Sequence, residues 1–375
     1  MNIPKLKKEK TVKNYHGYEI IDNYAYVDQP DNILEVLQNP EKLLPEVREY
    51  LEGNNKLTEE YFKDTKDLQK KLFSEIKSKI KLDDESLKFK DDRYFYWTKT
   101  VKDGNYVKYL RKKIDSNDIE NYFDGDKEKK LSGSKYFGLG SISVSHNDKL
   151  MAYSVDLKGS EYYDIFLRDL TTNKAIEEKI ENTSGSITWS LDSKSFFYTP
   201  LDKYHRSKKI YKHILGSSPK SDELIFEEKD DSYSVSITLT SDEKFFVITT
   251  SDSNTVEEYF FLSKEEKIKP LVFLAREKGI KYSIDSWKNH WYVHTNKDAL
   301  DYQMLRCDHM DIKKLEIFIP PKEETIIGGF DFLDDYILRA EKSDAIPKLF
   351  IRNIHTNEEE ELIISKEAVG SPGIS

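Results

Sequence analysis

Apolar and polar residues alternate along most of this chain, and polar turns interrupt the alternation at regular intervals. Residues 142–155 read Ile-Ser-Val-Ser-His-Asn-Asp-Lys-Leu-Met-Ala-Tyr-Ser-Val, and residues 187–198 read Ile-Thr-Trp-Ser-Leu-Asp-Ser-Lys-Ser-Phe-Phe-Tyr. Each stretch is an alternating run, a turn rich in Asp, Asn and Ser, and a second run with aromatic residues. This pattern predicts two antiparallel strands joined by a tight turn.

The same pattern recurs through most of the sequence. Further copies begin at Leu87, Val235, Tyr282 and Ile326, and the turns of all six copies fall about 44 to 57 residues apart. Because the period leaves room for four strands, it predicts a mainly β fold, a β-propeller with about six blades that ends near Ile364. The remaining strands are expected at residues 162–169, 209–215, 256–262, 302–307 and 348–354.

Helical patterns precede the strand repeats. Residues 1–15 are expected to form an extended or poorly ordered, solvated arm, and a first helix is predicted to begin at Pro45 and to end at Gly53. A second helix carries an apolar stripe with a spacing of four residues, which must dock on something. The stripe consists of Leu68, Leu72, Ile76 and Ile80.

These patterns divide the chain into two predicted regions. Residues 1–84 are expected to be an N-terminal arm with helices, and residues 85–375 an incomplete propeller. The final stretch, residues 365–375, shows no strand pair of its own.

Charge and composition narrow the function classes. The net charge is −10, and lysines cluster only in the first ten residues, which we interpret as a solvated terminus, so no nucleic-acid partner is expected. Cys307 is the single cysteine, no apolar leader precedes the arm, and no apolar run is long enough to span a bilayer. These features predict a cytoplasmic protein without a membrane contact.

Candidate catalytic chemistry is sparse. A nucleophile elbow of the Gly-x-Ser-x-Gly type is not present in the sequence, and Gly370-Ser-Pro-Gly has the wrong spacing. No phosphate loop or dinucleotide fingerprint occurs either. We therefore assign no catalytic residue and expect no cofactor.

The sequence contains three groups of possible metal ligands. His290 and His294 have the spacing of a helical zinc pair, but Trp-Tyr-Val between them favours a strand. Cys307 and His309 are two residues apart, where a structural cysteine is the better interpretation. The acidic run 358–361 is interpreted as a solvated turn. No metal site is expected.

Several stretches resemble one peptidase family. Residues 15–28, Tyr-His-Gly-Tyr-Glu-Ile-Ile-Asp-Asn-Tyr-Ala-Tyr-Val-Asp, are similar to the opening motif of the prolyl oligopeptidase family, and residues 47–55 to the helix that follows it. Residues 139–170 and 211–233 resemble the oligopeptidase B (protease II) branch more narrowly. The resemblance covers the chain from Tyr15 onward.

The resemblance implies a fold and an activity. Members have an N-terminal helical arm, a seven-bladed propeller and a C-terminal α/β-hydrolase domain with a Ser-Asp-His triad. The arm packs on the hydrolase domain, the propeller limits substrates to short peptides, and oligopeptidase B cleaves after Arg and Lys. This sequence departs from the pattern at Tyr26, where Trp is usual, and at Asn54, where an acidic residue is usual.

A third departure is that the sequence ends at Ser375, before a seventh blade and the hydrolase domain. We therefore expect the chain to be inactive alone, to leave apolar blade faces uncovered, and to be aggregation-prone or completed by a separately encoded hydrolase chain. The alternative is a free-standing propeller that binds peptides or proteins. The helical arm with its apolar stripe favours the peptidase interpretation.

Overall fold

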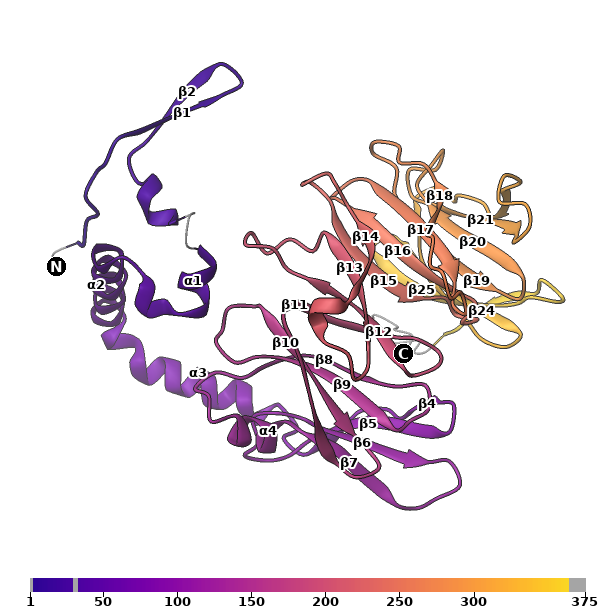
Figure 1. Ribbon diagram of the computed structural model, residues 1–375, viewed down its shortest axis with the longest axis horizontal. Coiled ribbons are helices and arrows are strands. Elements are labelled where there is room, and N and C mark those ends of the chain that lie inside the picture. The colour runs from indigo at the N-terminus through magenta and orange to yellow at the C-terminus, as the bar shows by residue number, and fades with distance from the viewer. Residues whose placement is uncertain (1–2, 30–32, 364–375) are drawn as a thin grey trace. The chain divides into compact units, whose positions relative to one another are not determined.

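The structure is a computed structural model, and it describes residues 3–29 and 33–363. The chain divides into two compact units (Figure 1). The first comprises residues 1–139 with 156–161, and the second residues 140–155 with 162–375.

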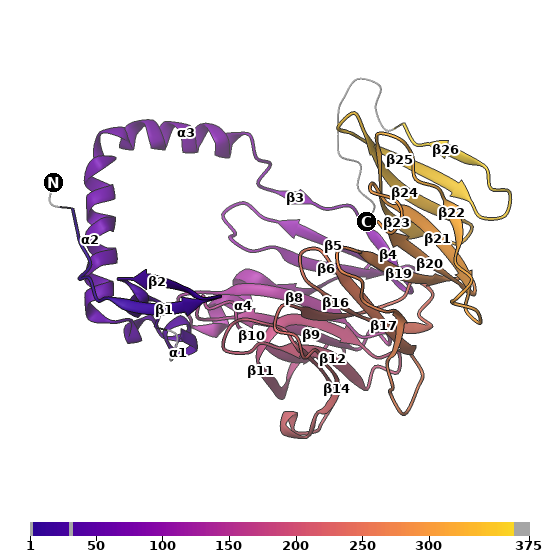
Figure 2. The same cartoon turned by 90° about the horizontal axis from the view of Figure 1, so that it is seen from above.

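The first unit begins with a β-hairpin and helices. Strands β1 (Thr11–Tyr15) and β2 (Tyr18–Asp22) are joined by a two-residue turn, and both turn residues have positive φ, 52° at His16 and 86° at Gly17. Such a turn matches the twist of a hairpin. The helices that follow are α1 (Ile33–Gln38), α2 (Pro45–Tyr61) and α3 (Lys66–Ser78), and the chain bends sharply between α2 and α3 (Figure 2).

The first helix was predicted to end at Gly53, and this prediction is wrong. Helix α2 starts at Pro45 as expected but continues through Gly53 to Tyr61. A β-carbon at Gly53 would lie 2.9 Å from Cγ of Pro4. The glycine therefore permits the N-terminal segment to approach the helix closely instead of terminating it.

The predicted second helix is confirmed as α3, with the apolar stripe largely on it. Leu68, Leu72 and Ile76 are 56 %, 47 % and 62 % exposed, and Ile80 follows the end of the helix. The stripe therefore finds no cover within the described part of its own unit.

The first unit also contains the first blade. Its strands are β3 (Asp84–Glu85), β4 (Phe89–Asp91), β5 (Tyr94–Thr100), β6 (Lys108–Lys113) and β7 (Ile119–Asp124), with β3 and β4 both pairing with β5. Helix α4 (Gly125–Ser132) follows, and the side chain of Asp124 caps it by accepting a hydrogen bond from the Lys127 amide.

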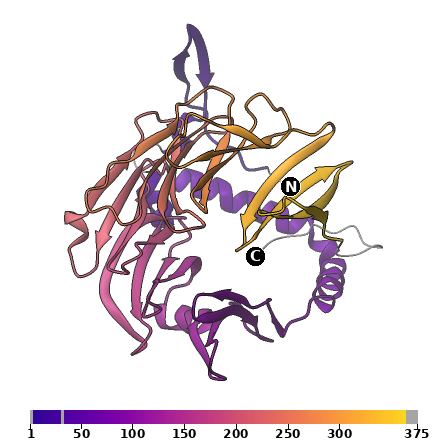
Figure 3. The same ribbon diagram turned by 90° about the vertical axis from the view of Figure 1, so that its right-hand side faces the viewer.

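The second unit is a succession of antiparallel sheets (Figure 3). Strands β8 to β14 form one seven-stranded sheet because the long strand β11 takes part in two consecutive blades, and three four-stranded sheets follow. Together with the sheet of the first unit, the described residues form the six blades that the repeat predicts. The bounds are β8 (Gly138–Val144), β9 (Leu150–Asp156), β10 (Tyr163–Asp169), β11 (Lys174–Trp189), β12 (Ser195–Pro200), β13 (Lys209–Ile214), β14 (Glu223–Glu227), β15 (Ser234–Leu239), β16 (Phe245–Ser251), β17 (Val256–Leu262), β18 (Leu271–Leu274), β19 (Tyr282–Trp287), β20 (His290–Thr295), β21 (Gln303–Asp308), β22 (Glu316–Ile319), β23 (Thr325–Phe332), β24 (Tyr336–Ser343), β25 (Ile346–Asn353) and β26 (Glu359–Glu361).

The repeated turn has a common hydrogen-bond pattern. In the turn before β12, the Ser190 hydroxyl donates to Asp192 and accepts from the Ser195 amide, while the Lys194 amide donates to Asp192. Ser193 has a φ of 58°. The turns that start at Ser145 and Thr240 repeat these bonds. Ser/Thr-x-Asp/Asn-x-Lys is thus the local code for the turn.

Apolar side chains fill the interface between consecutive sheets, which we call a seam. Between the third and fourth blades, Phe197 packs with Phe246 and Ile248. Between the fourth and fifth, Phe245 packs on Trp291, which is fully buried. The core of this unit therefore lies in the seams, which follows from the alternation of inward and outward side chains along each strand.

Candidate functional site

Successive blades of the second unit bring their first strands together around a small pocket. Strands β15, β19 and β23 contribute Thr238, Ser283, Asp285 and Gly329 to a cavity of about 240 Å³, and His294 of β20 also lines it. The pairing of β23 with β24 shifts register between Ile327 and Phe330, which indicates a bulge at this point.

The titratable groups in this pocket are held by neighbouring blades. Asp285 accepts hydrogen bonds from the amide and hydroxyl of Ser241 and from the Ser286 amide, and burial raises its pKa. His294 Nε2 lies 2.8 Å from the carbonyl of Ile327, and burial lowers the pKa of its ring, which keeps it neutral. Both groups tie adjacent blades and present a polar surface.

The exposed positions of two of these first strands, β15 and β19, carry hydroxyls. Ser234, Ser236 and Thr238 of β15 are exposed, alternating with buried apolar residues, and Ser283 of β19 continues the series. Hydroxyls can donate to or accept from a peptide backbone without requiring one side-chain charge. The surface therefore offers hydrogen-bond donors and acceptors that carry no fixed charge.

A serine, a histidine and an aspartate meet in the seam between the fourth and fifth blades. The Ser286 hydroxyl lies 2.9 Å from Oδ2 of Asp242 and 2.8 Å from Nε2 of His309. In a catalytic triad the histidine lies between the serine and the carboxylate. Here the serine lies in the middle and is fully buried, so the cluster joins two blades and has no nucleophile open to a substrate.

A second histidine is buried between two carboxylates. His213 of β13 is fully buried, with Nδ1 2.8 Å from Asp222 and Nε2 2.9 Å from Glu178. The Tyr198 hydroxyl donates to the other oxygen of Asp222. Because both ring nitrogens face a carboxylate, this arrangement fixes the loop after β13 and leaves neither nitrogen free for acid–base work.

The possible metal ligands of the sequence do not come together around one point in the structure. His290 and His294 lie on strand β20, where a separation of four residues amounts to roughly 13 Å, too far for one ion. Cys307 is 4 % exposed, and burial raises its pKa to about 11. Among the described residues, no group of three or more His, Cys, Asp or Glu side chains could hold a metal.

The acidic run 358–361 was interpreted as a solvated turn; its residues are exposed, as expected, but the turn is wrong for Glu359–Glu361. Residues Glu359–Glu361 form strand β26. Glu359 pairs through both carboxylate oxygens with Arg339, which is 1 % exposed and also contacts Glu341. A buried guanidinium requires such a partner, so the run neutralises a charge inside the sixth blade.

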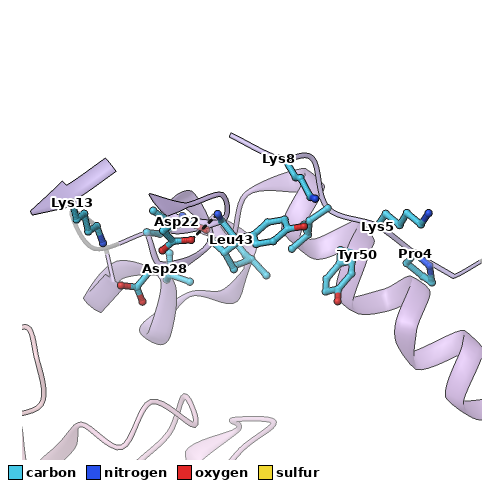
Figure 4. Close-up of a pocket in the computed structure, with 14 residues that line it drawn as sticks. Pro4, Lys5, Lys8, Lys13, Asp22, Asp28, Leu43 and Tyr50 are labelled. Atoms are coloured by element: carbon cyan, nitrogen blue, oxygen red, sulfur yellow. Dashed lines mark hydrogen bonds between the residues drawn. The ribbon is translucent and has the colours of Figure 1, made fainter. Parts of the chain in front are cut away.

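The arm of the first unit encloses a larger cavity. It measures about 880 Å³ and lies between the N-terminal segment, the hairpin and helix α2 (Figure 4). Lys5, Lys8 and Lys13 contribute cations, and Asp22 and Asp28 contribute carboxylates. Mixed charge around an apolar floor is typical of a contact surface between protein segments and supplies no catalytic group.

The two departures from the family motifs have local roles in this unit. The Tyr26 hydroxyl donates to the carbonyl of Lys7 and fastens the N-terminal segment. The Asn54 side-chain amide donates to the carbonyl of Tyr50, a bond that an ionised carboxylate could not form.

Among the described residues, no helix is both long enough and apolar enough to cross a membrane.

Comparison with known proteins gives relatives that are longer than this chain. Dipeptidyl aminopeptidase BI of Pseudoxanthomonas mexicana is 26 % identical over 98 % of this chain and 52 % of its own length. Protease 2 of Moraxella lacunata is 24 % identical over 96 % of this chain and 51 % of its own length. The chain thus spans about half the length of these curated relatives.

Solved structures agree in fold. Oligopeptidase B from Leishmania major superposes with a TM-score of 0.87 at 19 % identity, covering 98 % of this chain and 54 % of that one. Oligopeptidase B from Trypanosoma brucei, solved with covalently bound antipain in a closed form, gives 0.85 at 21 % identity over the same shares. The family model for the prolyl oligopeptidase N-terminal β-propeller domain matches residues 4–373, and the chain belongs to this family.

Proposed function

We propose that this chain is the arm-and-propeller portion of an oligopeptidase-B-like serine peptidase, which hydrolyses short peptides after Arg or Lys. The observation that carries the proposal is the match of the propeller family over residues 4–373, combined with relatives of about twice the length that are named as peptidases. The triad would belong to a hydrolase domain outside this sequence.

The local chemistry supports a non-catalytic role. Ser286, the serine that lies with a histidine and an aspartate, is buried between blades, and His213 is bound on both nitrogens. The hydroxyl-bearing strands β15 and β19 offer contacts to a peptide without selecting one side chain. The arm, with the exposed stripe on α3, would bind the hydrolase domain.

The test is recovery of this polypeptide from its native cells through an antibody to the arm. The recovered material is assayed with a fluorogenic peptide that ends in arginine. We expect hydrolysis that a serine-directed inhibitor abolishes, together with a hydrolase domain on the same or a second polypeptide. Recovery of the chain alone and without activity would contradict the proposal and favour the free-standing binding propeller.

A further inference from the structure

A buried carboxyl group crosses the seam between the fourth and fifth blades. Glu258 of β17 is 4 % exposed. Its Oε2 accepts a hydrogen bond of 2.7 Å from the amide of Ile284, which lies on β19 of the next blade, and its Oε1 accepts one of 2.9 Å from the Thr249 hydroxyl. This carboxyl group therefore joins the two sheets, together with the bonds of Ser241 to Asp285 and of Ser286 to Asp242 across the same seam.

The surroundings of Glu258 disfavour a negative charge. Its pKa is raised to about 8, mainly by burial and to a smaller extent by Asp285 on the adjoining sheet, against the hydrogen bonds from Thr249 and Ile284, which lower it. Tyr282 of β19 accepts from the Glu258 amide through its hydroxyl, which donates to the Leu274 carbonyl. On its own strand, Glu257 contacts the guanidinium of Arg276. The charged group that acts on Glu258 is therefore a second acid, Asp285, which opposes a negative charge on Glu258.

The same seam is incompletely filled at two places. The pocket of about 240 Å³, which also borders Gly329 of the sixth blade, is lined by Val247 from the fourth blade and by Ile284 from the fifth. A second cavity of about 590 Å³ is lined by Leu274 of the fourth blade and by Tyr282 and Leu305 of the fifth. Where a cavity lies between the two sheets, van der Waals contacts between them are absent. The free energy of local opening is therefore lower at an incompletely packed seam.

We propose that the seam between the β15–β18 sheet and the β19–β22 sheet is a proton-controlled joint, closed while Glu258 is neutral and loosened when Glu258 ionises. The geometry makes the coupling direct. A buried, ionised Glu258 without a cation beside it carries a large desolvation cost. Opening of the seam removes this cost because water then reaches the carboxylate.

The sign of the coupling follows from linkage. The pKa of Glu258 is about 8 in the closed seam, and it returns to about 4.5 when the seam opens and water reaches the carboxyl. Closure is therefore favoured most at low pH, is lost as the pH rises toward 8, and changes no further above that. Between these limits the opening equilibrium increases about tenfold per pH unit.

Amide hydrogen exchange on the 375-residue chain tests the joint. The reporter is the Ile284 amide, and the control is the Val235 amide, which donates across the preceding seam to the Ser207 carbonyl at 2.7 Å. We expect the protection factor of Ile284, corrected for intrinsic exchange, to fall about 70-fold between pH 5.5 and 7.5. The protection of Val235 should stay constant.

Two results would overturn the proposal. If the protection factors of Ile284 and Val235 fell equally with pH, ionisation of Glu258 would destabilise the whole unit and would not control this seam in particular. A protection factor at Ile284 that does not vary with pH would mean that the Glu258 carboxyl does not change its charge when the seam opens. In Glu258→Gln, which keeps an oxygen for the Ile284 amide, the slope at Ile284 should disappear; a slope that persists would belong to Asp285.

Discussion

The histidine between two carboxylates gives the sharpest stability prediction. His213 has no exposed surface, and its partner carboxylates Asp222 and Glu178 are 1 % and 16 % exposed at their side chains. Replacing His213 by Gln removes the ring whose two nitrogens contact both carboxylates. Removing one partner from a buried carboxylate costs about 3–5 kcal/mol, because the carboxylate is left buried without compensation.

The matched control is an exposed pair of the same kind. His355 lies 3.0 Å from Asp335, and the two side chains are 63 % and 54 % exposed. Exposed pairs contribute about 0–1 kcal/mol. His355→Gln should therefore leave the free energy of unfolding within about 1 kcal/mol of the unchanged chain, whereas His213→Gln should lower it several times more.

The assay is urea unfolding at pH 7, followed by circular dichroism and tryptophan fluorescence together, so that a two-state fit can be checked. Adding Asp222→Asn and Glu178→Gln to His213→Gln should restore part of the loss, because no carboxylate then remains buried. Equal effects of the two histidine substitutions, or a triple variant less stable than the single one, would refute the reasoning.

Three further outcomes are expected. Cys307, with a pKa of about 11 and almost no exposure, should resist alkylation at pH 8 while the chain is folded and react rapidly in urea, as mass spectrometry would show. Gly53→Ala should favour helix α2 by about 1 kcal/mol but displace Pro4, so tryptic cleavage of the N-terminal segment should accelerate; unchanged cleavage would contradict the contact. Leu72→Ser with Ile76→Ser should reduce binding of a hydrophobic dye without lowering unfolding free energy, because both side chains are exposed in this unit; a large loss of stability would show that the stripe is covered.

The strand repeat was predictable because its code is local. The turns that start at Ser145, Ser190 and Thr240 each combine a hydroxyl, an acceptor two residues later and a residue with positive φ within five positions. The alternation on both sides then sets which residues enter a seam. The end of α2 was not predictable in this way, because the role of Gly53 depends on Pro4, which lies about 50 residues away in sequence.

The polar clusters could not be predicted from the sequence, because their members also lie far apart along the chain. Ser286, Asp242 and His309 come from different turns and strands and meet only when two sheets stack. Glu258 reads as one more polar position in an alternating strand, and only the stacking of β19 on it shows that it is buried. The partner of Glu359 likewise lies 20 residues away, so composition alone favoured a solvated turn.

The central claim, that this chain supplies no nucleophile of its own, is tested most directly by a fluorophosphonate probe, which forms a covalent bond with activated serines. The purified 375-residue chain should take no label at any serine, Ser286 included, and should not hydrolyse an arginine-containing fluorogenic peptide. Labelling that maps to a serine of this chain and is lost together with hydrolysis when that serine is changed to alanine would contradict the account.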